Sequence, residues 1–258
     1  GVAASWKDVK AAPDELALLQ YTGGTTGVSK GVMLHHRQLI ANMQQINDVL
    51  KKVVIPGSEV VCAPLPIYHI YSLTFHCFVM LSQGSHMVLI PNPRDLDSFA
   101  AEFAKYPFTI LAGLNVLFVG LCQHPAFIPL DFKNLKVTFS GGVALTQSAA
   151  NEWKAVTGNE ILEGYGLTEA SPVISANRPY SVVLETVGKP LRDTQVKILG
   201  EGGELLTYGE TGELWVKGPQ VMQGYWKRPE ETRQVLSDGW LQTGDIARID
   251  RQGNIQIV

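Results

Sequence analysis

Cysteine is scarce in this sequence of 258 residues, and neither a long hydrophobic run nor a strong charge of one sign occurs in it. The cysteines, Cys62, Cys77 and Cys122, are an odd number in apolar surroundings, so we expect free thiols in a reducing compartment and no disulfides. A net charge of −3 argues against a nucleic-acid partner held by a broad basic face. The most apolar stretch, 71–81, has about half of the ~20 residues that a membrane-spanning helix needs.

Hydrophobic residues make up 45% of the chain, which is enough for a real core in one large α/β domain or two modest ones. No signal peptide is expected. The chain opens on Gly1-Val2 without methionine, and 255–258 stops within an alternating strand pattern. We therefore expect a piece of a longer protein.

The segment 21–31, Y-T-G-G-T-T-G-V-S-K-G, is typical of a phosphate-binding loop. Glycines let successive N–H groups turn toward one anion, threonines add hydroxyl donors, and lysine adds a positive charge. The apolar run 16–20 predicts a strand before the loop and the residues after it look helical, so we expect strand, loop and helix in that order. Glycine at position 31 distinguishes the segment from a Walker A loop, and a glycine-rich surface turn is the alternative. The candidate phosphate-binding residues are Thr22, Gly23, Gly24, Thr25, Thr26, Gly27 and Lys30.

The rest of the chain alternates between helical and strand patterns. Helices are expected at 36–52, 72–82, 95–105 and 114–122, and strands at 59–63, 85–90, 108–112 and 135–140. The strand at 85–90 is expected to be buried. This order predicts an α/β fold with a mainly parallel sheet covered by helices on both faces. From residue 182 short strands and glycine turns predict a small β-rich subdomain. We therefore divide the chain into 1–181 and 182–258.

Ligands of such sheets bind at the carboxyl ends of the strands, and several candidate ligand-binding segments of this chain lie there. Two prolines stiffen the segment 64–71, P-L-P-I-Y-H-I-Y, which presents His69 either as a packed core histidine or as a pocket wall. In G-Y-G at 164–166, Tyr165 is suited to stacking on a nucleobase. Thr168 and Glu169 are suited to a phosphate oxygen and its Mg²⁺, with ordinary turn chemistry as the alternative. Asp245 either binds ribose hydroxyls or caps a turn.

Taken in order, six motifs across residues 19 to 245 resemble the adenylate-forming (AMP-binding) enzymes, which include acyl-CoA synthetases, luciferases and peptide-synthetase adenylation domains. The segments between the motifs look most like bacterial long-chain fatty-acid–CoA ligases, of which this chain would be a truncated core. The motifs are T-G-G-T-T-G-V-S-K-G, P-L-P-I-Y-H-I-Y, S-G-G, G-Y-G-L-T-E, G-E-L-W-V-K-G and D-G-W-L-Q-T-G-D.

The resemblance implies a two-step reaction in which a fatty acid attacks the α-phosphate of ATP and coenzyme A then displaces AMP. By position, the loop from Thr22 to Lys30 would hold the β- and γ-phosphates, Thr168 the α-phosphate and Glu169 the Mg²⁺. His69 would lie where the acyl carboxylate enters. The adenosine would contact Gly141, Gly142, Tyr165 and Asp245.

The resemblance also implies what surrounds this chain in the whole enzyme. Family members carry a long N-terminal portion and a C-terminal lid domain with the lysine used in adenylation, so we expect this chain alone to bind nucleotide weakly without turnover. Ser29 stands where the family usually has proline, and Val143 where alanine is usual. The 72–82 helix and 112–114 are expected to border the acyl pocket.

Other functions stay open at this point. An adenylate-forming ligase for an aryl, shorter or amino acid is the nearest alternative, although no acidic residue is evident to pair with an amino acid's ammonium group. A nucleotide-binding module without catalysis is the alternative from another class. A cytoplasmic location is expected. Peripheral contact with the inner face of the membrane and a homodimer are both left open. The sequence contains no basic amphipathic segment that would supply the membrane contact.

Overall fold

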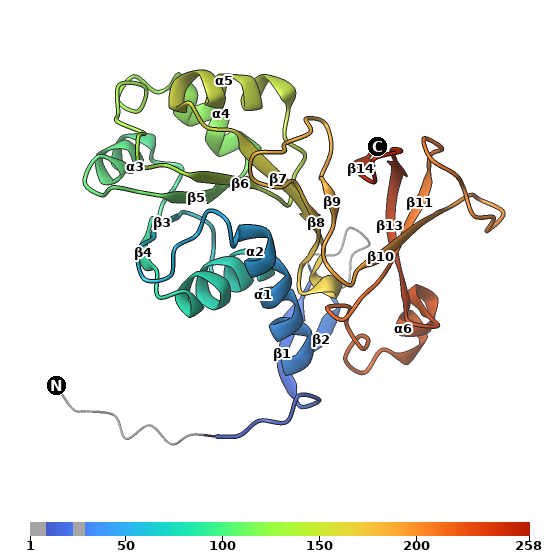
Figure 1. Cartoon of the computed structure of the whole chain (residues 1–258). Coiled ribbons are helices and arrows are strands. Elements are labelled where there is room, and N and C mark those ends of the chain that lie inside the picture. The colour runs from blue at the N-terminus through green and yellow to red at the C-terminus, as the bar shows by residue number, and fades with distance from the viewer. Residues whose placement is uncertain (1–8, 23–28) are drawn as a thin grey trace.

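The computed structural model describes residues 9–22 and 29–258, and a seven-stranded sheet forms the centre of its larger part (Figure 1). The strand order is β4-β3-β5-β6-β7-β8-β9, in which the first five strands are parallel and the last two antiparallel. The bounds are β3 (Val60–Ala63), β4 (His86–Leu89), β5 (Ile110–Gly113), β6 (Val137–Ser140), β7 (Ile161–Gly166), β8 (Val173–Ala176) and β9 (Lys189–Pro190).

Helices cover both faces of this sheet, as the alternating pattern predicted (Figure 1). Successive strand residues point to opposite faces, so Ile110 and Ala112 pack in one core and Leu111 in the other. The first face carries α1 (His36–Leu50), α2 (Ile70–Ser72) and the π-helix η1 (Leu73–Met80), and the second carries α3 (Leu96–Phe103), α4 (Asn115–Gln123) and α5 (Gln147–Thr157). Thr146 caps α5, because its Oγ1 accepts the Ala149 N–H.

The β4 strand differs from its prediction. A buried strand was expected, but His86 and Leu89 are exposed because β4 lies at the edge of the sheet and is paired on one side alone among the described strands. The apolar residues predict a strand, but they do not predict whether it is central or at an edge, because that depends on pairing with distant segments.

A smaller antiparallel sheet follows, again as predicted, in the order β10-β11-β13-β12 with β14 paired to β13. Its strands are β10 (Gln195–Leu199), β11 (Gly212–Lys217), β12 (Leu236–Ser237), β13 (Trp240–Ile249) and β14 (Ile255–Ile257), and α6 (Pro229–Val235) precedes β12. Leu214 and Val216 pack in one core with the hairpin described next. The division at residue 182 stays a prediction.

The glycine-rich loop connects β1 (Leu16–Tyr21) to β2 (Gly31–His35), which form an antiparallel pair. The predicted order of strand, loop and helix is therefore wrong, since a strand precedes α1. Val32 and Leu34 are fully buried, and this alternation is what a strand with one buried face requires. The predicted residues Gly23, Gly24, Thr25, Thr26 and Gly27 lie outside the described residues.

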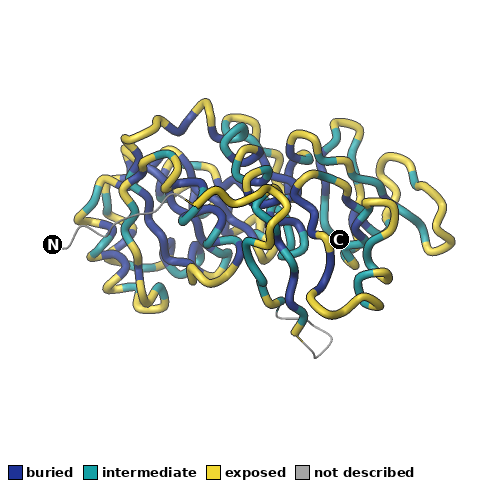
Figure 2. Tube along the Cα trace, turned by 90° about the horizontal axis from the view of Figure 1, so that it is seen from below, coloured by how far each residue is buried: buried dark blue, intermediate teal, exposed yellow. Residues whose placement is uncertain are grey.

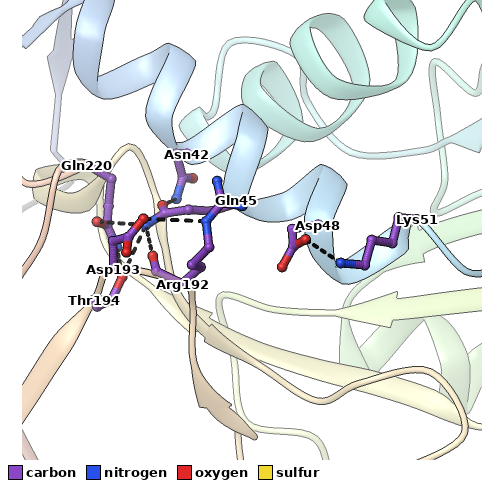
Figure 3. Close-up of polar contacts among 8 residues, drawn as sticks. All are labelled: Asn42, Gln45, Asp48, Lys51, Arg192, Asp193, Thr194 and Gln220. Atoms are coloured by element: carbon purple, nitrogen blue, oxygen red, sulfur yellow. Dashed lines mark hydrogen bonds and ion pairs between the residues drawn. The ribbon is translucent and has the colours of Figure 1, made fainter.

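A buried amide network joins α1 to the smaller sheet's side of the molecule (Figure 3). Gln45 Nε2 on α1 donates to Arg192 O at 2.6 Å and approaches Gln220 Oε1 at 3.3 Å. Gln220 Nε2 donates to Thr194 Oγ1 at 2.8 Å. The amide side chains of Gln45 and Gln220 are buried and mutually satisfied, so they fix how these segments meet.

Buried residues are concentrated in the interior of both sheets, and exposed residues are concentrated in the loops (Figure 2). The cysteines are free, as predicted; Cys62 and Cys122 are buried and Cys77 is half-buried. In the described part of the chain, no helix has the length and apolarity needed to cross a membrane.

Candidate active site

A cavity of about 630 Å³ lies where the parallel strands end, between the larger sheet, α1, η1 and the segment around Tyr225. Parallel strands present their carboxyl ends at one edge, so the segments after β6 and β7 meet there. Of the predicted site residues that the structure describes, those lining the cavity are Thr22, Lys30, His69, Gly141, Gly142, Tyr165, Thr168 and Glu169.

The charged end of the cavity is organised by a tyrosine that the sequence did not reveal as a site residue. The Tyr225 hydroxyl donates to Glu169 Oε1 at 2.7 Å, and Lys30 Nζ lies 4.9 Å from the centroid of the Tyr225 ring. Burial, followed by the negative charge of Glu169 and the hydrogen bond to it, raises the pKa of Tyr225. The phenol therefore stays protonated and remains a donor to the carboxylate.

Asp245 reaches the cavity through Tyr165. The Tyr165 hydroxyl donates to Asp245 Oδ2 at 2.5 Å, and the Asp245 N–H donates to Thr243 Oγ1 at 3.1 Å. Burial and this hydrogen bond raise the pKa of Tyr165, so its phenol is protonated at neutral pH. Lys30 and Glu169, which come from distant parts of the sequence, thus line one cavity, whereas Asp245 is not among the lining residues and is joined to it only through Tyr165.

Two residues that line the cavity carry a buried hydroxyl without a hydrogen-bond partner in the described part of the chain. Tyr71 Oη and Ser140 Oγ both belong to lining residues and have no hydrogen-bond partner among the described residues. Burial also raises the pKa of Tyr71, which keeps that hydroxyl a donor. A buried polar group without a partner costs about 1–3 kcal/mol. Both hydroxyls are therefore polar groups in the wall of the cavity that the described residues leave unsatisfied.

Glycines let the backbone approach the cavity closely after β6. Gly142 has φ of +80°, a conformation that favours glycine, and a Cβ on Gly141 would lie 3.6 Å from the Tyr71 ring. A side chain larger than a methyl group at position 141 would therefore press on the Tyr71 ring, which lines the cavity. Val143, noted as unusual for the family, is exposed.

His69 lies at the start of α2 and is exposed to solvent while lining the cavity. Its Nδ1 accepts the Tyr71 N–H at 3.2 Å, so in the neutral imidazole Nε2 carries the proton. His69 therefore offers a hydrogen-bond donor at the mouth. Of its two interpretations, the structure favours a pocket wall over a packed core histidine.

The other end of the cavity is an apolar recess. Phe75 of η1 lines it, in agreement with the prediction for that helix, whereas 112–114 do not belong to the lining. The α1 residues were missed, although their helical spacing was visible in the sequence. The recess is lined by Ile46, Val49, Leu50, Phe75, Phe139 and Leu191.

The two ends of the glycine-rich loop are held together at the mouth. Thr22 N–H donates to Lys30 O at 3.0 Å, and Ser29 Oγ donates to Thr22 O at 2.6 Å. Proline at position 29 could not make the second bond, so Ser29 compensates for the stiffness that a proline would supply.

The donor set suits a magnesium ion that arrives on phosphates. Glu169 is the one carboxylate among the cavity-lining residues, and the described residues contain no cluster of three or more His, Cys, Asp or Glu side chains. Mg²⁺ usually keeps several waters and binds one or two carboxylates together with substrate phosphates. A single carboxylate beside Lys30 and Thr168 fits that mode.

Residues 2–226 match the family model of the AMP-binding enzymes. The chain belongs to this family. It is 45% identical over 248 residues to the long-chain-fatty-acid–CoA ligase of Escherichia coli, an alignment that covers 95% of this chain and 44% of that protein. It is 32% identical over 260 residues to 4-coumarate–CoA ligase 3 of Oryza sativa, covering 97% of this chain and 47% of the relative.

Among solved family structures, ATP-bound MatB from Rhodopseudomonas palustris superposes with a TM-score of 0.89 at 32% identity. The superposition covers 98% of this chain and 50% of that one. The chain thus spans about half the length of the relatives that it matches, and the adenylate-forming α/β fold expected from the motifs is confirmed.

Proposed function

We propose that the whole protein activates a long-chain fatty acid with ATP and transfers the acyl group to coenzyme A. The observation that carries this proposal is one cavity that joins a charged end, with Lys30 and Glu169, to the apolar recess under α1. A fatty acid needs both environments, because its carboxylate reacts at the charged end while its hydrocarbon chain is removed from water in the apolar recess. The names of the bacterial relatives support the same substrate class.

The nucleotide would lie along the charged end. Lys30 and the loop that it closes would hold the β- and γ-phosphates, and Thr168 would donate to the α-phosphate. Gly141, Gly142 and Tyr165 would border the adenine. The two glycines carry no side chain, so the flat base could lie directly against their backbone. Asp245, aligned by the Tyr165 hydroxyl, would accept from the ribose hydroxyls.

In the first step, a carboxylate oxygen of the fatty acid attacks the α-phosphorus, the bond to the bridging oxygen breaks, and pyrophosphate leaves. His69 would donate from Nε2 to the other carboxylate oxygen and so orient the acid for in-line attack. Lys30 would neutralise charge that develops on the leaving group. Glu169 would hold Mg²⁺, which supplies charge neutralisation at the phosphates when bound.

In the second step, the sulfur of coenzyme A attacks the acyl carbonyl, the bond to the adenylate oxygen breaks, and AMP leaves with the acyl group now on sulfur. The cavity-lining residues would retain the acyl-adenylate until coenzyme A arrives, since hydrolysis would waste it.

Two other functions remain as alternatives. A ligase for an aryl or shorter acid is favoured by the 32% identity to the rice 4-coumarate–CoA ligase. A nucleotide-binding module without catalysis would have no use for an apolar recess beside the phosphate end, so the cavity argues against it.

Exchange of labelled pyrophosphate into ATP, driven by palmitate in the whole protein, tests the proposal. We expect exchange that requires the fatty acid and Mg²⁺ and that falls for short and aryl acids. Exchange with coumarate in preference to palmitate would favour the aryl ligase. ATP binding without exchange for any acid would refute activation altogether.

A further inference from the structure

Tyr225 lies between the two charged side chains at the phosphate end, and the function proposed above gives it no role. Its hydroxyl donates to Glu169 Oε1 at 2.7 Å, while Lys30 Nζ lies 4.9 Å from the centroid of its ring. The residue is 6% exposed and lines the cavity with both of them. A phenol can hold an anion with its hydroxyl and attract a cation with its face. One side chain thus contacts both groups that would meet a magnesium nucleotide.

The backbone around Tyr225 is arranged to keep the ring in this position. Tyr225 pairs with Val32 of β2 as an antiparallel bridge, and the Trp226 N–H donates to Gly31 O at 2.7 Å. The Tyr225 N–H donates to Thr232 Oγ1 of α6 at 2.9 Å. These bonds hold the Tyr225 segment against both β2, the strand that follows Lys30, and α6.

Gly224 makes the approach of α6 to this segment possible. Its φ is +148°, and a Cβ there would lie 2.7 Å from Thr232 Cγ2. Because glycine alone avoids both the strain and the clash, the sequence Gly224-Tyr225 is required by the position of the ring.

Glu169 is held by the same segment at two points. The Met222 N–H donates to Glu169 O at 2.7 Å, and Tyr225 engages Oε1 of the side chain. Tyr225 takes one lone pair of Oε1, and Oε2 has no hydrogen-bond partner among the described residues. The segment 222–225 therefore sets both the place and the rotation of this carboxylate relative to Lys30.

We propose that Tyr225 is a positioning residue for the magnesium nucleotide: its hydroxyl orients the Glu169 carboxylate toward the cation, and its ring holds the Lys30 ammonium at the phosphates. The inference rests on the proposed roles of Glu169 and Lys30. It separates into two effects, since the hydroxyl controls the Mg²⁺ dependence and the ring controls the contribution of Lys30.

The hydroxyl is tested by Tyr225→Phe, which keeps the ring. Binding of α,β-methylene ATP, which cannot release pyrophosphate at the α-position, is measured by calorimetry over a range of Mg²⁺ concentrations. We expect the half-saturating Mg²⁺ concentration to rise on the order of tenfold, because a hydrogen bond to a charged group is lost. Saturating Mg²⁺ should restore nucleotide binding, which it would not do for a folding defect.

Tyr208→Phe is the matched control, because it removes the same hydroxyl from an exposed tyrosine that does not line the cavity. Its Mg²⁺ dependence should equal that of the wild type. If Tyr225→Phe also stays within about twofold of the wild type, the positioning role of the hydroxyl is overturned.

The ring is tested by a double-mutant cycle of Tyr225→Leu and Lys30→Met. A cation–π contact contributes about 0.5–1 kcal/mol at an exposed site, so Lys30→Met should weaken nucleotide binding about threefold less when the ring is already gone. Equal effects of Lys30→Met in both backgrounds would refute the contact between ring and ammonium. If Tyr225→Leu fails to fold, Tyr225→Phe still tests whether the Tyr225 hydroxyl orients the Glu169 carboxylate.

The pyrophosphate exchange assay keeps this inference apart from the function on which it rests. Wild-type protein that shows no acid-dependent exchange refutes the ligase, whatever the Tyr225 variants do. Wild-type protein that exchanges normally, together with an unchanged Mg²⁺ dependence in Tyr225→Phe, refutes the inference alone.

Discussion

The apolar recess should set the length of the acid that the protein accepts, and enlarging Val49 tests this. Val49 is half-buried on α1 and lines the cavity together with Ile46 and Leu50. Phenylalanine in place of valine adds carbon atoms to a wall that a long acyl chain would contact. Because Val49 is partly exposed, the α1 helix can accept the larger side chain at less cost than at Leu50, which is 1% exposed.

The magnitude follows from the burial of methylene groups. If the new ring excludes two methylenes of the acyl chain, the loss at ~0.8 kcal/mol for each is ~1.6 kcal/mol. At 1.36 kcal/mol per factor of ten, kcat/KM for long acids should fall about 15-fold. Acids short enough to end before the ring should react as in the wild type.

The assay is acid-dependent pyrophosphate exchange with saturated acids from hexanoate to stearate. Ile40→Phe is the control, since it adds bulk to the same helix at an exposed residue that does not line the cavity. A length profile of Val49→Phe that matches the wild type, or a uniform loss at every length, would refute an acyl chain lying along α1.

Three further changes have defined outcomes. Lys30→Met should raise the KM for ATP about 10-fold to 100-fold, as loss of a charge-assisted hydrogen bond predicts, with an unchanged circular dichroism spectrum. Trp153→Ala should lower the free energy of unfolding by ~3–5 kcal/mol in urea titrations, because Trp153 is fully buried. Burial lowers the pKa of His76 from 6.5 to about 4, so the native state binds fewer protons than the unfolded chain between these values. The stability from neutral His76 should be complete above this window and be lost as the pH falls through it, and His76→Gln should flatten that part of the stability profile.

The α/β alternation was predictable because the local signals agree with the final fold. Ile110, Leu111 and Ala112 are apolar on successive positions, as a strand buried on both faces requires. Thr146 and Gly158 mark the ends of α5, with an accepting hydroxyl at one end and a left-handed glycine at the other. Such signals need no knowledge of distant segments.

Pairing between distant segments explains what the sequence did not reveal. Gly31–His35 is short and directly precedes a strong helix, so its strand character depends on pairing with β1 across the loop. Tyr225 lies in none of the six motifs, and its position depends on a contact with Glu169, 56 positions away. Its pairing of an aromatic residue with a preceding glycine was a usable signal, as in the Gly-Tyr-Gly segment around Tyr165.

The chemistry-bearing residues were easier to predict than the walls of the cavity. Lys30, Thr168 and Glu169 could be proposed because hydroxyl and charged side chains beside glycines are typical of phosphate-binding segments, and all three line the cavity. Ile46 and Val49 could not be separated from ordinary core residues, because an apolar helix face looks the same over a packed core and over a cavity. Placing the recess therefore required the structure.

One side chain on α1 sets the distance between the recess and the nucleotide end. Asn42 Nδ2 donates to Val173 O at 2.8 Å and its Oδ1 accepts the Val173 N–H at 3.0 Å, so the side chain pairs with β8 as a neighbouring strand would. Val173 lines the cavity, and Val49 lies two turns further along the helix. A buried ion pair at this joint would carry a desolvation cost and place charge near the phosphates, whereas a neutral amide with its partners satisfied does neither. The acyl wall is thereby held in register with the strand that follows Glu169 without disturbing the electrostatics that Lys30 and Glu169 supply.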